Sequence, residues 1–298
     1  MGPDLIPPDV RGRLRTLRLT ARRAADLQGL GLHHSRARGA GLEFAQYRGY
    51  ERGDEPRMID WKLYARSGKF FVRESERESP LRLWILLDAS ASMGQADRAQ
   101  PTRSRLDAAM GLAACLGQLA MNQGDRFGLV VLSDAGLNVI DAADGVRQRD
   151  RLALALRAVE PRGGFPALAQ LGPLWDRVGP SDLVVLLSDF FDEGTVTLAE
   201  RLAAAGREVL AIQILSVEER DFPFAQGHRF RDPETGEELL GDGKVLRDEF
   251  LSRFAAAQTE LAARLEHDGI RHARLVLDEA LDVPLRRLFG SGHADEYS

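Results

Sequence analysis

The sequence predicts a doubly wound α/β fold with a mostly parallel central sheet. From about residue 81, short apolar runs alternate with segments of helical periodicity. Two of these runs, 81–87 and 183–188, are apolar except for Arg82 and the final Ser188, which is typical of strands covered by helices on both faces. Each run is followed by an aspartate, Asp88 and Asp189. Alternation of strands and helices favours right-handed parallel crossovers, and therefore a sheet whose strand ends share one edge.

The other elements follow in order. We expect helices at 104–121, 146–159, 195–205 and 244–267, and strands at 126–133, 137–140, 208–216 and 270–277. Residues 221–240 interrupt the alternation and predict a hairpin. Asp278 follows the last strand and is expected to cap a short terminal helix.

Composition places the chain among ordinary globular proteins. Of its 298 residues, 44% are hydrophobic and 29% charged, and the net charge of −5 gives no overall bias toward nucleic acid. No apolar run reaches about 18 residues, so no membrane span is expected. The first residues lack the basic-then-apolar order of a signal peptide, and the single Cys115 fits a buried core position. We therefore expect a cytoplasmic protein.

The segment 1–40 is basic, with eight arginines against three aspartates. Residues Val10, Leu14, Leu17, Ala21 and Ala24 share one face at helical spacing and predict a helix. Two interpretations remain open. The helix packs on the main domain with a solvated basic face, or its arginines dock an acidic partner or a phosphate.

Residues 41–80 predict a small β-containing appendage. Stretches at 42–47 and 69–73 have strand character, and a turn is expected at 53–56. The segment carries a mixed-charge set around a tryptophan: Arg48, Asp54, Arg57, Asp60, Trp61 and Arg66. Such a set forms either a hydrogen-bonded structural knot, since Arg and Asp pair directionally, or a surface that recognises a partner.

The oxygen-bearing residues after the first buried strand predict a binding site. Asp88, Ser90 and Ser92 occur at alternate positions, so their side chains can turn toward one point. Ligands of open α/β sheets bind outside the carboxyl ends of strands, where Asp189 is also expected. Hard oxygen ligands of this kind suit Mg²⁺ or Mn²⁺. The competing interpretation is that both aspartates cap the helices that follow.

The stretches DASASM (88–93) and LLSDF (186–190) resemble the metal-ion-dependent adhesion site of von Willebrand factor A domains. The resemblance implies Asp88, Ser90, Ser92 and Asp189 as metal ligands. It also implies a threonine in a second loop, here PRGGF (161–165), where this chain has Phe165 instead. Bound Mg²⁺ or Mn²⁺ is therefore expected to be weak or absent, and a degenerate site that binds partners without metal is a further interpretation.

The 41–80 segment has a second resemblance, to the bacterial "domain of unknown function 58" family. It is carried by Arg48, Tyr50, Gly53–Asp54, Arg57, Ile59–Trp61 and Ala65–Arg66, and later by EERDFPF (218–224) and TGE (235–237). The resemblance implies a von Willebrand A-like domain preceded by such a segment. It also implies a non-enzymatic adaptor that works beside a MoxR-type AAA+ ATPase in the maturation or remodelling of protein complexes.

These observations give a predicted domain plan and one rival function. The plan is a basic helical extension at 1–40, the signature segment at 41–80, a von Willebrand A-like domain at 81–280 with a hairpin insertion near 221–242, and a terminal helix and tail at 281–298. The rival is a Mg²⁺-dependent phosphoryl-transfer hydrolase with Asp88 as nucleophile. Such enzymes usually need a carboxylate two residues later, where Ser90 stands, and the sequence has no phosphate-loop motif.

Overall fold

The computed structural model describes residues 4–21, 45–51, 56, 59–75, 80–97, 101–224, 227–231 and 238–290. The chain divides into two compact units. One comprises residues 1–28 together with 81–298, and the other comprises residues 29–80.

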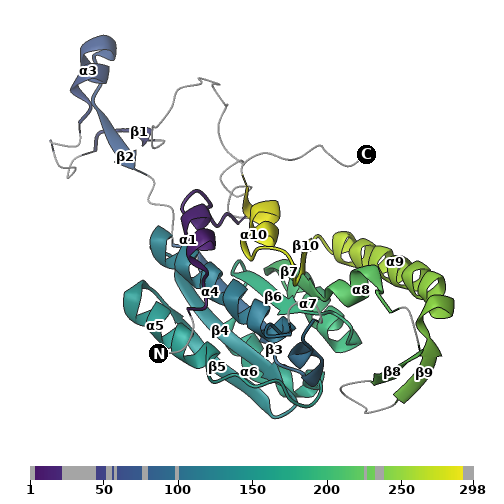
Figure 1. Cartoon of the computed structure of the whole chain (residues 1–298). Coiled ribbons are helices and arrows are strands. Elements are labelled where there is room, and N and C mark those ends of the chain that lie inside the picture. The colour runs from purple at the N-terminus through teal and green to yellow at the C-terminus, as the bar shows by residue number, and fades with distance from the viewer. Residues whose placement is uncertain are drawn as a thin grey trace. The chain divides into compact units, whose positions relative to one another are not determined.

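The larger unit is built on a six-stranded sheet of order β10-β7-β6-β3-β4-β5 (Figure 1). Its strands are β3 (Arg82–Asp88), β4 (Arg126–Ser133), β5 (Gly136–Ala143), β6 (Leu183–Ser188), β7 (Glu208–Leu215) and β10 (Arg271–Val276). All neighbours are parallel except β4 and β5, which are antiparallel. From β3 the chain moves outward to β4 and β5, then returns to β6 on the other side of β3. The predicted mostly parallel, doubly wound sheet is confirmed, and the β3–β6 junction is its switch point.

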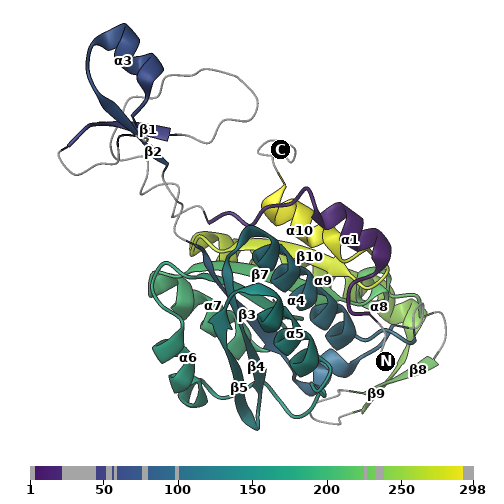
Figure 2. The same ribbon diagram turned by 90° about the vertical axis from the view of Figure 1, so that its left-hand side faces the viewer.

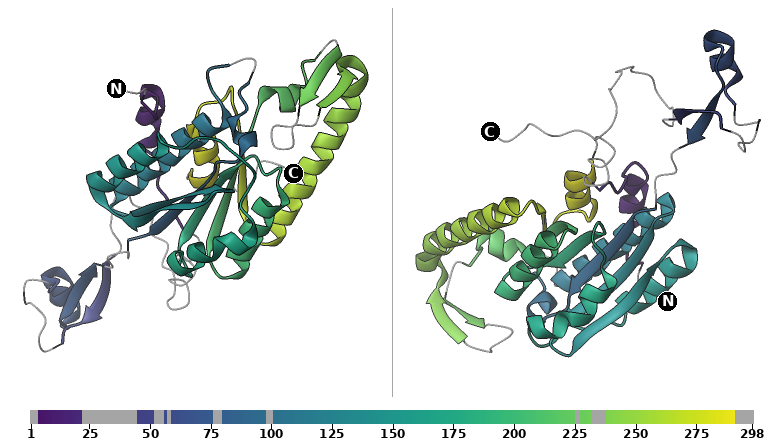
Figure 3. Two further views of the ribbon diagram at one scale, coloured as in Figure 1. Left: turned by 90° about the horizontal axis from the view of Figure 1, so that it is seen from below. Right: turned by 180° about the vertical axis from the view of Figure 1, so that it is seen from behind.

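Helices cover both faces of this sheet (Figures 2 and 3). One face carries α1 (Pro8–Leu14), α4 (Arg105–Gln123), α5 (Gly145–Leu156) and α10 (Asp282–Phe289), and the other carries α6 (Gly172–Arg177), α7 (Glu193–Ala204) and α9 (Gly243–His267). Side chains of β3 alternate between the layers: Leu83 and Ile85 join the first core, and Trp84 and Leu86 the second. Both faces are thus buried, as the continuous apolar strands required.

The basic N-terminal helix is shorter than predicted. Helix α1 ends at Leu14, although Leu17 and Leu19 beyond it are also buried. The backbone N–H of Leu19 donates to the Gln123 side chain, 2.7 Å away, so this stretch pairs with α4 instead of continuing as a helix. Residues 4–21 therefore contribute to the main core, whereas Ala24 lies outside the described residues.

Two further elements lie between β7 and β10. After the short helix α8 (Val217–Asp221), strands β8 (Gly227–Arg231) and β9 (Glu238–Asp242) pair as an antiparallel hairpin that leads into α9. The prediction that Asp278 caps the terminal helix is wrong, because α10 begins four residues later, at Asp282. Asp278 instead pairs with Arg220 at the surface, which ties the end of β10 to α8.

The smaller unit contains strands β1 (Ala45–Gly49) and β2 (Phe71–Ser75), which pair antiparallel, and helix α3 (Trp61–Ser67). Asp60 caps α3 by accepting from the backbone N–H groups of Lys62 and Leu63, each at 2.9 Å. Gly68 ends the helix in a left-handed conformation, φ 66°, which glycine adopts without strain.

Candidate functional site

The loop after β3 gathers three of the predicted oxygen ligands. Because β3 and β6 pair in parallel with Leu87 opposite Leu187, Asp88 ends its strand beside Ser188. The Ser188 hydroxyl donates to Asp88 Oδ2 at 2.6 Å, and the Ser90 N–H donates to Asp88 Oδ1 at 2.9 Å. The hydroxyl oxygens of Ser90 and Ser92 are 3.1 Å apart.

The fourth predicted ligand, Asp189, follows β6 at the same edge of the sheet. Its Oδ1 accepts from the Phe191 N–H, and its Oδ2 accepts from Nη1 of Arg105, both at 3.1 Å. Its charge is one of the causes that raise the pKa of Asp88, so the two carboxylates lie within electrostatic range. All four predicted ligand side chains are buried, with exposed fractions from 1% to 8%.

Helix capping does not explain the two aspartates. Helix α4 is capped by Ser104, which forms a reciprocal capping box with Asp107, and α7 is capped by Asp192. Asp88 and Asp189 each accept a backbone N–H two residues ahead, a local turn that leaves a second carboxylate oxygen directed elsewhere. The capping interpretation is therefore wrong.

The PRGGF loop at 161–165 lies against the loop that follows β3. The Arg162 N–H donates to the Ala89 carbonyl at 3.0 Å, and the Ala91 N–H donates to the Gly163 carbonyl at 2.8 Å. Phe165 is partly buried, packs against the second core and contributes no oxygen ligand. The loop thus lies where the resemblance implies the second ligand loop, with an apolar side chain at the threonine position.

Gly163 holds this loop in a conformation that other residues disfavour. Its φ is +60°, and a Cβ there would lie 1.8 Å from Asp134 Oδ2. Asp134 is exposed and can swing away, so we expect Gly163→Ala to lower the free energy of unfolding by about 1–2 kcal/mol, mostly from the left-handed backbone. Denaturant unfolding measures the change. Gly164→Ala is the matched control, since its Cβ would meet no described atom within 4 Å. An equal decrease of the unfolding free energy in both variants would contradict a cost specific to the left-handed backbone of Gly163.

Sequence reasoning missed a buried arginine at this edge. Arg105, with 1% of its surface exposed, donates from Nη1 to Asp189 and to the Ser92 carbonyl at 3.0 Å, and from Nη2 to Glu219. The sequence did contain an indication that Arg105 is unusual. The Ser104–Asp107 capping box fixes Arg105 as the first residue of α4, where the helix dipole disfavours a positive charge.

Burial and polar partners shift the pKa values of the carboxyl groups at this site in opposite directions. Burial raises the pKa of Asp88 to about 6, although the hydrogen bonds from Ser188 and the Ser90 backbone act in the opposite direction. Burial also raises the pKa of Glu219, against the lowering effect of Arg105. The edge therefore concentrates acidic groups in a poorly solvated place, with one arginine among them.

As they stand, the residues do not fit a divalent cation. The two serine hydroxyls converge, but Asp88 Oδ2 already accepts from Ser188 and Asp189 Oδ2 from Arg105. Phe165 supplies no oxygen from the PRGGF loop. Among the described residues, no group of three or more His, Cys, Asp or Glu side chains is arranged to hold a metal ion.

The signature residues of the smaller unit are only partly described. Asp60 caps α3, Trp61 is 57% exposed, and Arg66 is exposed in the last turn of that helix. The backbone of Arg48 pairs with Val72 in the β1–β2 ladder. Asp54 and Arg57 lie outside the described residues, and so does the choice between a structural knot and a partner surface for the full set.

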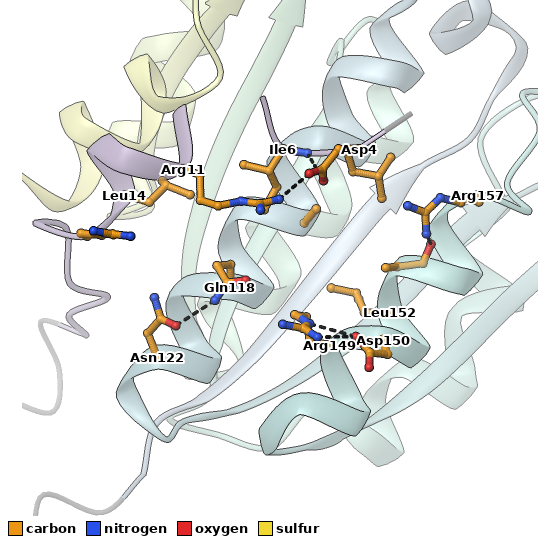
Figure 4. Close-up of a pocket in the computed structure, with 14 residues that line it drawn as sticks. Asp4, Ile6, Arg11, Leu14, Gln118, Asn122, Arg149, Asp150, Leu152 and Arg157 are labelled. Carbon is orange, nitrogen blue, oxygen red and sulfur yellow. Dashed lines mark hydrogen bonds and ion pairs between the residues drawn. The ribbon is translucent and has the colours of Figure 1, made fainter. Parts of the chain in front are cut away.

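A separate groove of about 620 Å³ lies between α1, α4 and α5 (Figure 4). Two of its four arginines form ion pairs, Arg11 with Asp4 and Arg149 with Asp150. The lining therefore has two more arginines than aspartates, and the predicted site residues are elsewhere, at the carboxyl edge of the sheet.

Comparison with known proteins adds a family match. The model of a family described as "Protein of unknown function DUF58" matches residues 46–260. An uncharacterized protein of Mycobacterium bovis and one of Mycobacterium tuberculosis are each 28% identical over 272 residues, 89% of this chain and 84% of theirs.

Solved structures with a similar arrangement include an aerotolerance-related membrane protein from Bacteroides fragilis and the SpRpn10 VWA domain. The first is 17% identical with a TM-score of 0.44 and covers 69% of this chain and 95% of its own. The second is 15% identical with a TM-score of 0.39 and covers 70% and 95%. In the described part of this chain, no helix is long and apolar enough to cross a membrane.

Proposed function

Since the chain belongs to the DUF58 family and has a von Willebrand A-like α/β fold, we propose that it is a non-enzymatic adaptor acting beside a MoxR-type AAA+ ATPase. Its clients would be protein complexes that the ATPase matures or remodels. The fold and the family support a protein-interaction module. The named ATPase and a cytoplasmic location are the further steps of the proposal. The first comes from the family resemblance and the second from the composition of the chain, with its single Cys115.

The observation that carries the interaction role is an exposed aromatic cluster in the smaller unit, formed by Tyr50, Trp61, Tyr64 and Phe70. The rings of Tyr64 and Phe70 stack at 4.3 Å between centroids, and Trp61 meets both edge-on at 6.1 and 6.4 Å. Trp61 and Phe70 remain 57% and 45% exposed. Aromatic residues held rigidly at a surface are typical anchors of protein interfaces.

The charges around this cluster indicate the chemistry of its partner. Lys62, Arg66 and Lys69 are exposed on α3 and the turn that follows it. Basic side chains around an aromatic centre suit a partner surface that combines apolar residues with acidic ones. The signature residues Asp60, Trp61 and Arg66 therefore serve here as the helix cap, the anchor and the rim of a docking surface.

Replacing Trp61 by Ala tests this surface. We expect affinity for the cognate MoxR-type ATPase, measured by calorimetry with Mg²⁺ and ATP, to fall about 10- to 100-fold, as is usual for an interface tryptophan. The melting temperature should barely change, because Trp61 is mostly exposed. The matched control is Leu154→Ala, an exposed apolar residue of α5 that is 72% accessible. Unchanged binding in Trp61→Ala would contradict the docking surface.

The second part of the proposal concerns the carboxyl edge of the sheet. We propose that Asp88, Ser90, Ser92 and Asp189 form a degenerate adhesion site in which Mg²⁺ or Mn²⁺ binding is weak or absent. The hydrolase alternative is tested with the same protein. Phosphatase turnover that survives repurification and disappears in Asp88→Ala would favour the enzyme and overturn the adaptor proposal.

A further inference from the structure

We propose that Arg105 is the resident cation of the carboxyl-edge site and takes the place of a divalent metal ion. Its guanidinium joins three segments that follow three different strands. It reaches the Ser92 carbonyl after β3, Asp189 after β6 and Glu219 in α8 after β7. The inference concerns the site itself and holds whichever protein the adaptor binds.

The surroundings of Arg105 are unfavourable for a positive charge unless negative groups compensate it. The side chain is fully buried at the positive end of the 19-residue helix α4, and among the described residues its Nε has no hydrogen-bond partner. Both burial and the helix dipole disfavour a cation there. Two carboxylates compensate it, and the Phe191 ring, centred 5.3 Å from the guanidinium carbon, covers it.

Glu219 is positioned for this partner. Its Oε2 accepts the Ser216 N–H at 2.8 Å within the capping box of α8, which directs Oε1 toward Arg105. An arginine presents several donors in a planar fork, so it can hold two carboxylates and a carbonyl at once. A divalent ion at an adhesion site likewise binds oxygen atoms from several loops. Arg105 already binds one of the predicted metal ligands, Asp189.

The proposal predicts that metal binding appears only after Arg105 is removed. The wild-type protein, titrated with MnCl₂ and followed by the electron paramagnetic resonance of free Mn²⁺, should bind no stoichiometric ion at micromolar concentration. Arg105→Ala leaves Asp189 and Glu219 uncompensated near Asp88 and should lower the melting temperature. Mn²⁺ at a hundredfold excess over its Kd should then raise that temperature by about 5–10 °C.

Arg207 supplies a matched control. It is also buried, at 9% exposure, but its described hydrogen bonds go to the carbonyls of Val178 and Ala205, and its guanidinium stacks on the Trp175 ring. Arg207→Ala should therefore lower the melting temperature without any recovery in Mn²⁺. Adding Asp189→Asn to Arg105→Ala should abolish the recovery seen in the single variant.

Two results would overturn the proposal. One is a wild-type protein that binds one Mn²⁺ at micromolar concentration and loses it on Asp189→Asn. The other is an Arg105→Ala variant that responds to Mn²⁺ no more than Arg207→Ala does. If Arg105→Ala does not fold, Arg105→Gln keeps hydrogen-bond donors while removing the charge, and the same two comparisons apply to it.

Discussion

Replacing Asp88 by Asn is expected to stabilise the metal-free protein above pH 6. Burial raises the pKa of Asp88 from 3.8 to about 6, so between these values the folded state binds more protons than the unfolded state. Stability from this group therefore falls as the pH rises through the window, and the cost persists above it. A shift of this size corresponds to about 3 kcal/mol. Asn carries no charge, and its side-chain oxygen can still accept from the Ser90 N–H. Its amide nitrogen would lie beside the Ser188 hydroxyl.

Urea unfolding of wild type and Asp88→Asn at pH 4.0 and pH 8.0, with EDTA present, measures the difference. The two proteins should differ little near pH 4.0 and by about 3 kcal/mol at pH 8.0. A resident divalent ion would reverse the sign at pH 8.0, because it favours the charged carboxylate. The same titration with 5 mM Mg²⁺ is the control, and an Asn variant that is less stable than wild type at pH 8.0 would contradict the prediction.

Much of the architecture could be predicted because the two strands that carry the site are almost continuously apolar. Runs such as Leu183–Ser188 have to be covered on both faces, and the aspartates that follow them then meet at one sheet edge. The same logic placed Asp88 and Asp189 together. The PRGGF loop was assigned to the site only by the resemblance to adhesion sites, and the hydrogen bonds of Arg162 and Gly163 now show it beside the loop that follows β3.

The polar partners of the site were less predictable. Arg105 lies 17 residues after Asp88, and Glu219 lies 30 residues after Asp189, so their convergence depends on how helices α4 and α8 pack against the sheet. Periodicity gives the length of a helix and not the direction of a charged side chain at its end. The capping box that begins helix α4 could be recognised in the sequence, but Glu219 could not be recognised there as a partner that compensates Arg105.

The N-terminal helix shows a second limit, since helical spacing of apolar residues does not require a helix. Leu17 is buried as its spacing suggested, and Leu19 is buried as well, yet the helix ends at Leu14. A hydrogen bond from the Leu19 backbone to Gln123 in α4 stabilises the extended path. Tertiary contacts thus overrode local periodicity there.

The larger unit also contains a histidine with the opposite pH dependence. Burial, assisted by the nearby Arg274, lowers the pKa of His272 on β10 to about 4, and within the described residues its Nε2 has no hydrogen-bond partner. Between pH 6.5 and pH 4 the unfolded state then binds more protons than the folded state. Stability from this group is complete above pH 6.5 and is lost as the pH falls, by about 3 kcal/mol in total.

We therefore expect His272→Leu to remove this loss, because leucine does not titrate. As the pH is lowered from 6.5 to 4.5, the unfolding free energy of this variant should fall less steeply than that of wild type. Urea unfolding at intervals of half a pH unit measures the difference. Arg274→Gln is a graded control, since it removes the neighbouring charge and should shrink the loss without abolishing it. Parallel curves for wild type and His272→Leu would contradict the assignment.

In the wild-type protein the two groups act against each other. Between pH 4 and pH 6, Asp88 lowers stability as the pH rises and His272 raises it, by similar amounts. Their strands are separated by β6 and β7, three strand spacings or about 14 Å, so their contributions should add. These two contributions should thus nearly cancel in wild type; Asp88→Asn should make stability rise with pH, His272→Leu should make it fall, and the double variant should be nearly flat again. A double variant that follows either single variant would show that one of the two groups does not titrate as its burial implies.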